Sequence, residues 1–285
     1  MCILITTTRH PDYKLIALSN RDEFLSRPTE LAKWRRGDIL SPCDLARPEH
    51  GTWIGVTRSG RFTCLLNFHE KNPANAVGTI SRGLFTKDFL KSDLAPQQWV
   101  QQTKEAYDLS CTGGFTMVCG SLAGDTPEVA LLSNHDSRLP EEGGTWAISN
   151  SLIQEPWPKA ISGRKLLDKL VDNASDYSED GIVEEGFKIL SVDTYPRDLE
   201  NGNGVPNGVE RAGKNMRLLE YVRESIFVPR LDVNCEMGNG YGTRTQTVVL
   251  VRNDGSVRYI EWDIQSREKH EYEFLIHQTD RSEAT

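Results

Sequence analysis

Short apolar runs joined by turn residues recur along the chain and predict antiparallel hairpins. The predicted pairs are 2–8 with 14–19, 52–57 with 61–67, 115–121 with 128–132, and 247–252 with 256–263. The last pair encloses Asn253-Asp254-Gly255, which is a strong hairpin turn signal. Because such short loops join only antiparallel neighbours, this pattern argues against a parallel βαβ sheet.

Four segments carry apolar residues at helical spacing instead: 82–91, 96–107, 158–171 and 179–190. Hairpins with helices grouped between them predict an α+β fold of packed layers. No repeat or linker divides the sequence, so we expect one domain over residues 1–276. The polar, Asn-Gly-rich stretch at 196–213 predicts a mobile loop, and residues 277–285 a frayed tail.

Composition narrows the function classes. The chain has 285 residues, of which 38% are apolar and 26% charged, and a net charge of -8. These values are typical of a globular protein and argue against a nucleic-acid partner, which requires clustered Lys and Arg. We expect no secretory signal and no transmembrane segment, since the first apolar run is short and none approaches membrane-spanning length.

The cysteines and histidines give no indication of a cofactor. The six cysteines include no C-x-x-C pair, which favours reduced thiols in a cytoplasmic compartment. No two histidines have ligand spacing, so we expect neither a metal nor another cofactor. The sequence does not indicate the oligomeric state.

Cys2 follows the initiator methionine and starts the first predicted strand. If Met1 is removed, one residue carries both a thiol and a free α-amino group. An unperturbed α-amine, with a pKa of about 7.7–8.0, can act as base for a thiol of pKa about 8.5. N-terminal nucleophile enzymes use this arrangement. A buried cysteine is equally an ordinary apolar core residue, so position alone leaves both interpretations open.

Asn20, Arg21, Asp22 and Glu23 end the second predicted strand. In a hairpin, the end of the second strand returns to the level at which the first begins. We therefore expect these four side chains to lie beside Cys2. The alternative is an exposed polar turn with a weak internal ion pair.

Three further residues are candidates for the same site. Asn67 and Asn150 end other predicted strands, where their amides can donate to the oxyanion of an acyl-transfer intermediate, although asparagine is also an ordinary turn residue there. The glycine-rich stretch 238–243 precedes a strand, so it matches no nucleotide-binding loop. We expect a flexible turn that can bring Arg244 to the site as an anion or carbonyl contact.

Six blocks, in this order, resemble the NRDE family, also called the transport and Golgi organisation protein 2 family. They are Met1-Cys2, Asn20-Arg21-Asp22-Glu23-Phe24, Gly51-Thr52-Trp53-Ile54-Gly55, Ser149-Asn150, Pro156-Trp157 and Gly240-Tyr241-Gly242-Thr243-Arg244-Thr245. The similarity extends from residue 1 to about residue 276. The family in turn resembles the N-terminal nucleophile hydrolases, which implies an αββα four-layer sandwich of two antiparallel sheets between helices.

The penicillin V acylases and bile salt hydrolases have the most similar pattern, which implies catalytic roles for Cys2, Asp22, Asn67 and Asn150. One position differs: where those hydrolases have an arginine, this chain has Ser19, and its own arginine is Arg21.

Two functions follow from the resemblance, and both remain open. One is a cysteine amidohydrolase that cleaves a C–N amide bond of an acyl amide. The other is a protein that handles lipid, acyl-CoA or haem in intracellular trafficking or Golgi organisation. For such a protein the resemblance also implies association with the Golgi or with mitochondria. In that case Asn20, Arg21, Glu23 and Arg244 would bind a polar head group. For haem, the sequence offers no C-x-x-C-H motif and no obvious axial pair.

Overall fold

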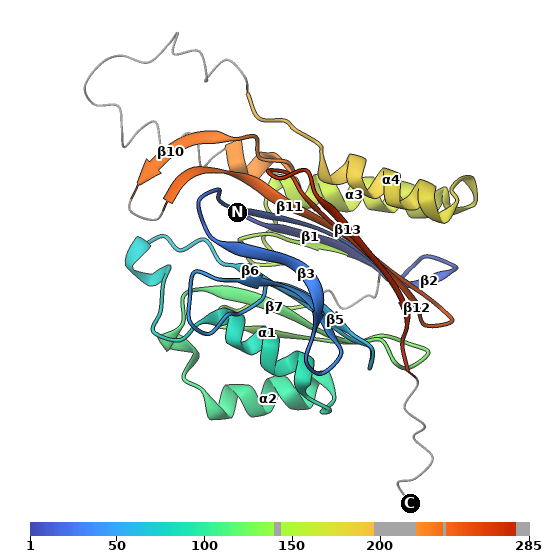
Figure 1. Cartoon of the computed structure of the whole chain (residues 1–285), viewed down its shortest axis with the longest axis horizontal. Coiled ribbons are helices and arrows are strands. Elements are labelled where there is room, and N and C mark those ends of the chain that lie inside the picture. Colours follow the sequence, from blue (N-terminus) through green and yellow to red (C-terminus); the bar gives the residue numbers. More distant parts are fainter. Residues whose placement is uncertain (140–143, 197–220, 236–237, 278–285) are drawn as a thin grey trace, which may run out of the picture.

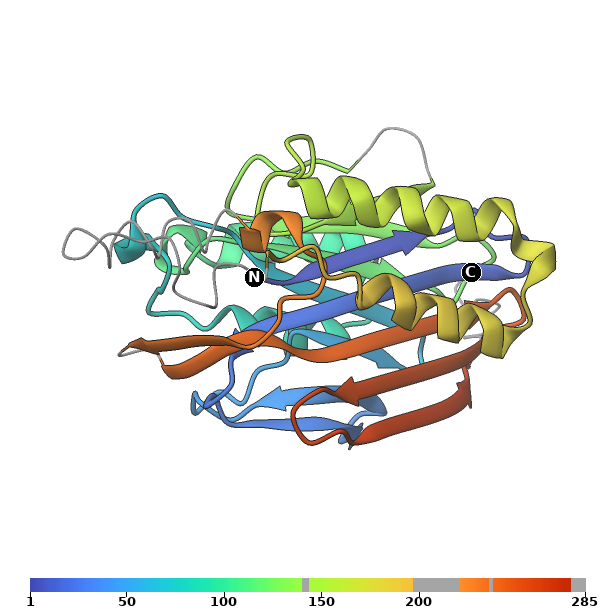
Figure 2. The ribbon, with the colours of Figure 1, turned by 90° about the horizontal axis from the view of Figure 1, so that it is seen from above.

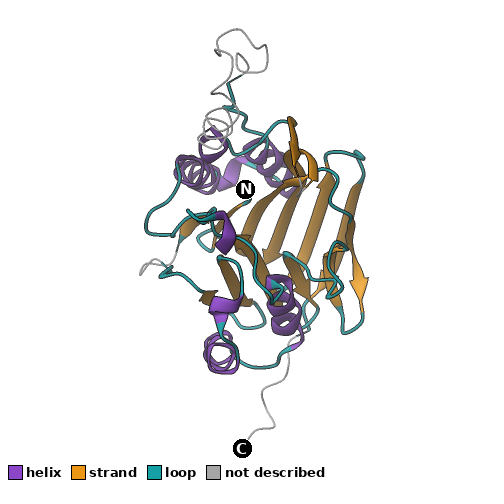
Figure 3. Cartoon of the chain, turned by 90° about the vertical axis from the view of Figure 1, so that its left-hand side faces the viewer, coloured by secondary structure: helices purple, strands orange, loops and turns teal. Residues whose placement is uncertain are grey.

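The computed structural model describes residues 1–139, 144–196, 221–235 and 238–277. Two antiparallel sheets are stacked face to face, and each carries a pair of helices on its outer face (Figure 1). Seen from the side, the helices lie outside the stacked sheets (Figure 3). This is the predicted αββα arrangement, which the structure confirms.

The first sheet contains both the first and the last strand of the described chain. Its strand order is β13-β12-β11-β2-β1-β9, and β10 pairs with β11. The strands are β1 (Ile3–Thr7), β2 (Tyr13–Phe24), β9 (Thr145–Ile148), β10 (Leu231–Cys235), β11 (Gly238–Arg252), β12 (Ser256–Asp263) and β13 (Lys269–Leu275). Helices α3 (Pro158–Asp172) and α4 (Glu179–Leu190) cover its outer face (Figure 2).

The second sheet follows the chain in simple order, β3-β4-β5-β6-β7-β8. Its strands are β3 (Thr29–Arg35), β4 (Ile39–Asp44), β5 (Ile54–Thr57), β6 (Arg61–Asn67), β7 (Phe115–Ser121) and β8 (Glu128–Ser133). Helices α1 (Arg82–Lys91) and α2 (Pro96–Ala106) pack against it. The described elements also include a helical turn at 221–224 and three 3-10 turns: η1 (Pro73–Asn75), η2 (Leu109–Cys111) and η3 (Ala174–Asp176).

Successive side chains along each strand point to opposite faces of its sheet, and the apolar ones form three layers: between the sheets and under each pair of helices. In β1, Ile3 and Ile5 face α3 and α4, whereas Leu4 faces the second sheet. A separate cluster joins the second sheet to α1 and α2. Gly163 lets α3 lie close to β1, since a Cβ there would be 2.5 Å from Cδ1 of Ile5. This close approach brings the start of α3 to the N-terminus.

The four predicted hairpins and four predicted helices are confirmed, with ends that differ by at most two residues except in two strands. The second strand continues to Phe24 rather than ending at Ser19, because its polar residues are buried and paired. The glycine-rich stretch from Gly238 is part of β11 rather than a flexible turn, because it pairs with both β2 and β10. Strands β3, β4, β10 and β13 were not predicted.

Two predicted segments lie largely outside the described residues. The mobile loop expected at 196–213 has only its first residue in the described part, and the expected tail only residue 277. Both therefore stay predictions, as does the single domain over residues 1–276. Within the described ranges, no helix is both long and apolar enough to cross a membrane.

Candidate active site

Cys2 lies at the start of β1, between two strands that carry candidate residues. In the β1–β2 ladder Ile3 pairs with Asn20, and in the β1–β9 ladder Leu4 pairs with Ile148. Continuing these registers places Arg21 on one side of Cys2 and Asn150 on the other. The hydroxyl of Ser149 donates to the Cys2 carbonyl at 2.8 Å and holds this end of β1 in place.

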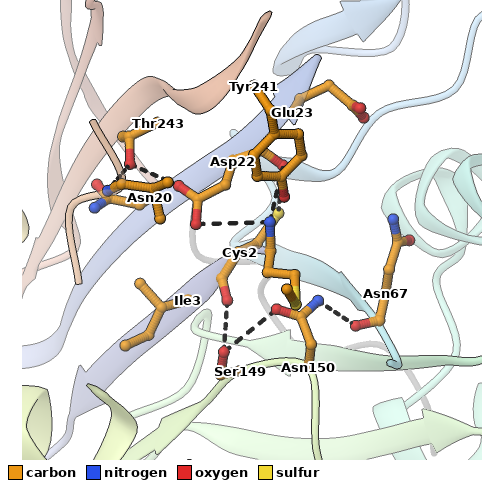
Figure 4. Close-up of polar contacts among 12 residues, drawn as sticks. Cys2, Ile3, Asn20, Asp22, Glu23, Asn67, Ser149, Asn150, Tyr241 and Thr243 are labelled. Atoms are coloured by element: carbon orange, nitrogen blue, oxygen red, sulfur yellow. Dashed lines mark hydrogen bonds and ion pairs between the residues drawn. The ribbon is translucent and has the colours of Figure 1, made fainter. Parts of the chain in front are cut away.

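The α-amino group of Met1 contacts Asp22. It donates to the Asp22 carbonyl at 3.3 Å and lies 3.7 Å from the Asp22 Oδ2 atom. The Asp22 side chain is fully buried. Its Oδ1 atom accepts from the hydroxyl of Thr243 at 2.7 Å (Figure 4). Its Oδ2 atom lies 3.4 Å from Nζ of Lys159. The same Nζ donates to the Met1 carbonyl at 2.6 Å.

The thiol of Cys2 contacts the same Asp22 carbonyl as the N-terminus, with Sγ 3.8 Å from its oxygen. Burial raises the pKa of this thiol above its ordinary value, and the positive charges of the N-terminus and Arg21 oppose that shift. Burial also lowers the pKa of the Met1 α-amino group, while the Asp22 carboxylate opposes it. With Met1 in place, the neutral thiol is therefore favoured.

Asn150 ties the two sheets together beside Cys2. Its Nδ2 atom donates to the Asn67 carbonyl at 2.5 Å, and its own carbonyl accepts from the His69 amide at 2.8 Å. Asn67 thus contributes a backbone group to this contact, and the residue is exposed at the end of β6. Asn150 keeps a second amide hydrogen for another acceptor.

Arg21 and Glu23 lie on the face of β2 that is directed at the second sheet. The Arg21 guanidinium is centred 4.2 Å from the Trp53 ring, and its Nη2 atom lies 3.4 Å from Oε2 of Glu23. Its Nη1 atom is buried and has no hydrogen-bond partner. Ser19 lies on the same face, two residues before Arg21, and its hydroxyl donates to the Ile3 carbonyl at 3.0 Å.

Arg244 occupies an irregularity in the β11–β2 ladder, between Thr243 and Thr245. Such bulges redirect a side chain. Arg244 donates to the Arg27 carbonyl, and its Nε atom lies 3.8 Å from Oδ2 of Asp263. Burial and the nearby charge of Arg21 lower the pKa of Arg244. The structure thus brings Arg244 near Arg21, but the Arg244 side chain contacts Arg27 and Asp263.

Asn20 differs from the other candidates because its side chain is directed away from Cys2. It is fully buried on the helix-facing side of β2. Its Nδ2 atom donates to the carbonyls of Leu190 at 2.8 Å and Ile226 at 2.9 Å. The expectation that Asn20 binds a ligand does not fit this geometry, so Asn20 is not part of the site we propose.

Sequence reasoning missed Lys159 and Thr243, the two side-chain partners of Asp22. Lys159 lies in the first turn of α3, directly after Pro158. A lysine is disfavoured there, because the helix N-terminus carries partial positive charge. This unfavourable placement was the sequence signal that could have identified Lys159. Thr243 lies in the block Gly240-Tyr241-Gly242-Thr243-Arg244-Thr245, but its partner is far away in the sequence.

A surface groove of about 550 Å³ lies elsewhere, between α2 and β8. Its lining includes Val100, Val129 and Leu131, with Gln97 and Gln101. The groove does not border Cys2, and its lining includes no cysteine, serine or histidine. The residues that bring a nucleophile close to a buried carboxylate are therefore those around Cys2, and not those of this groove.

Comparisons with known proteins agree with the block pattern. A family model described as transport and Golgi organisation 2 matches residues 1–266. An uncharacterised protein of Saccharomyces cerevisiae is 32% identical over 288 residues, covering 92% of this chain and 91% of its own. A Bos taurus protein named transport and Golgi organization protein 2 homolog is 28% identical over 274 residues, covering 93% and 92%.

Among solved structures, a mutant of the conjugated bile acid hydrolase from Clostridium perfringens aligns over 98% of both chains, at 8% identity and a TM-score of 0.38. The family is established by the model that matches residues 1–266. This chain belongs to the transport and Golgi organisation 2 family.

Proposed function

We propose that, once Met1 is removed, Cys2 is the nucleophile of a cysteine amidohydrolase that cleaves a C–N amide bond. The observation that supports this most is the buried carboxylate of Asp22 beside the N-terminus, with the backbone carbonyl of the same residue next to the Cys2 thiol. Burying a charged group is unfavourable unless it is paired. A cysteine that served only as a core residue would have no need of such a surrounding.

The proposed reaction uses one base throughout. The α-amine of Cys2, oriented by Asp22, takes the thiol proton, and the thiolate attacks the substrate carbonyl. The second amide hydrogen of Asn150, with the amide of Asn67, donates to the resulting oxyanion. The protonated amine then gives its proton to the leaving nitrogen, and a thioester remains on Cys2. Water, deprotonated by the same amine, releases the acid and restores the thiol.

Turnover of a panel of N-acyl amides by the chain lacking Met1 tests this function. We expect measurable hydrolysis that Cys2→Ala abolishes. The matched control is Cys111→Ala, because Cys111 is exposed on η2, outside the site, and its loss should leave turnover unchanged. Turnover that survives Cys2→Ala would exclude the mechanism.

A second candidate is binding of an anionic head group, as in acyl-CoA, a phospholipid or haem, in trafficking or Golgi organisation. The unpartnered Nη1 atom of Arg21 favours it. So does nearby Arg82, whose pKa is lowered to about 10, first by burial and then by the charges of Arg47 and Arg27. Guanidinium groups crowded in this way gain from a bound phosphate or carboxylate.

Titration of the protein with an acyl-CoA, a phospholipid or haem tests this candidate. Arg21→Gln should weaken binding by about tenfold or more, since a hydrogen bond to a charged group contributes roughly 1.5–3 kcal/mol. Arg9→Gln is the matched control, because Arg9 is exposed beyond the far end of β1 and pairs with Asp168 and Asp172 in the second half of α3. Equal affinity in Arg21→Gln and the unmodified protein would argue against a head-group role.

A further inference from the structure

Lys159 is placed where a lysine is doubly unfavourable. Its side chain is completely buried, and it lies in the first turn of α3. Burial removes the hydration of its charge, and the helix N-terminus adds partial positive charge nearby. A position with both penalties calls for a compensating role.

Within the described part of the chain, the polar contacts of the Lys159 side chain lie around the N-terminus. Its Nζ atom donates to the Met1 carbonyl at 2.6 Å and lies 3.4 Å from Oδ2 of Asp22. The Cys2 nitrogen is bonded to the same Met1 carbonyl carbon. Standard peptide geometry therefore puts this nitrogen about 2.3 Å from the Met1 oxygen, and within about 5 Å of Nζ.

We infer that Lys159 is a positioning residue whose charge, beside the α-amino group of Cys2, keeps this amine in its neutral, proton-accepting form. The inference rests on the proposed function, in which Met1 is absent and Cys2 is the nucleophile. Lys159 acts through this amine and does not itself react with the substrate.

The Lys159 charge favours the neutral amine. Removal of Met1 takes one acceptor from the Lys159 ammonium and leaves the Cys2 amine beside it. A protonated amine would place two cations side by side, so the neutral form is favoured there. The lone pair of the neutral amine then stays free to take the thiol proton.

Charge balance requires such a group. Asp22 alone would stabilise the protonated amine, which cannot take the thiol proton, and the Lys159 charge offsets that effect. At the Met1 amine, whose pKa is lowered mainly by burial, the Asp22 charge raises the pKa and the Lys159 charge lowers it. Among the described residues, the titratable groups that act on this amine or respond to its charge include Cys2, Asp22, Glu23, His69 and Lys159.

The test measures the α-amine directly and needs no substrate. A fusion protein cut directly before residue 2 supplies the full chain without Met1, and Cys2→Ala removes interference from the thiol. The rate of α-amine acetylation by trace acetic anhydride is followed against pH, by mass spectrometry of the N-terminal peptide. Lys159→Met, Lys159→Arg and the control Lys165→Met, which lies on the exposed face of α3, are compared in this background.

Lys159→Met should raise the midpoint of acetylation by about one pH unit or more, the usual effect of losing a charge within 4–6 Å. Lys159→Arg keeps the charge and should restore most of the difference, and Lys165→Met should change nothing. An equal midpoint with Lys159 and with Lys159→Met overturns the inference, because a purely structural ion pair would alter only stability.

A second comparison covers the case in which Lys159→Met does not fold. Asp22→Asn and the double variant Asp22→Asn, Lys159→Met leave no unpaired carboxylate, and the double variant should have the higher midpoint. Equal midpoints in that pair also overturn the inference. Turnover is measured separately with Cys2 intact: a shifted midpoint without turnover contradicts only the proposed function, and turnover with an unshifted midpoint contradicts only the role of Lys159.

Discussion

At the scale of single residues, Asp22 is the centre of the N-terminal cluster. Its carboxylate is contacted by Thr243 from β11, Lys159 from α3 and the N-terminus ahead of β1. These partners come from distant parts of the sequence. The cluster therefore forms only when the first sheet and α3 are assembled, and each partner depends on the others.

Asp22→Asn should destabilise the fold. It leaves the fully buried ammonium of Lys159 without its carboxylate, and breaking a buried pair in this way typically costs about 3–5 kcal/mol. Urea unfolding measures the loss. Combining Asp22→Asn with Lys159→Met should recover part of it, since neither charge is then left alone. A loss below about 1 kcal/mol for Asp22→Asn would contradict a tightly coupled pair.

The thiol of Cys2 should react slowly while Met1 is present. Burial raises its pKa, so the reactive thiolate is scarce at neutral pH, and the exposed thiol of Cys111 should be alkylated first by iodoacetamide. Peptide mass spectrometry reads both sites in one sample. Removal of Met1 supplies the base and should reverse the order. Faster alkylation of Cys2 than of Cys111 in the Met1-containing chain would count against this account of the thiol.

At the scale of elements, β2 organises the site because its alternating residues serve two different layers. Asn20 and Asp22 face the helices, whereas Ser19, Arg21 and Glu23 face the second sheet. One strand thereby supplies both a structural link to α4 and the polar surroundings of Cys2. Period-two alternation explains why neighbouring residues of a four-letter block have different roles.

Asn20→Leu tests the structural role at this scale. The change removes both hydrogen bonds to the buried carbonyls of Leu190 and Ile226, and should cost roughly 2–4 kcal/mol in urea unfolding. Asn20→Asp, which keeps the size and loses the donors, should also destabilise. Unchanged stability together with weakened ligand binding would instead restore Asn20 to the ligand site.

Glu261 of β12 links the two sheets and should make stability depend on pH. Its buried carboxyl accepts from the Ala32 amide of β3 at 3.1 Å, and burial raises the pKa of Glu261 to about 7. A raised carboxyl pKa stabilises the protonated form, so this contribution is complete below about pH 4.5 and is lost as pH rises through about 7.

The expected loss for Glu261 is about 3 kcal/mol over that range, since one pKa unit corresponds to 1.36 kcal/mol. Urea unfolding between pH 5 and 8 should therefore show a smaller decline for Glu261→Gln than for the unmodified protein. Glu268→Gln, at an exposed position on the turn after β12, is the control. Parallel curves for Glu261→Gln and the unmodified protein would contradict the assignment.

At the scale of the whole molecule, the sequence predicted the elements whose apolar pattern is strong. Helices α1 and α4 have the predicted bounds, and the hairpins of β1–β2 and β11–β12 were recognised. Strands β3 and β13 escaped because they are edge strands of their sheets, and exposed polar residues interrupt their apolar pattern. Edge strands pair on one side only, so their sequences are less constrained.

The candidate site was predictable as a neighbourhood but not as a set of contacts. Hairpin topology correctly put the block from Asn20 to Glu23 at the level of Cys2. It did not reveal that Asn20 is directed away from Cys2, or that Lys159 contacts Asp22. Those facts depend on how α3 and α4 lie against the first sheet, which no local pattern encodes.

The central claim is that Cys2 acts with its own α-amino group, and this requires that Met1 be removed. The most direct measurement is the intact mass of the protein isolated from the cells that make it naturally. We predict a chain that begins at Cys2, lighter by one methionine residue than the full sequence. A protein that retains Met1 would contradict the claim, because the nitrogen of Cys2 would then be a peptide nitrogen and unable to accept the thiol proton.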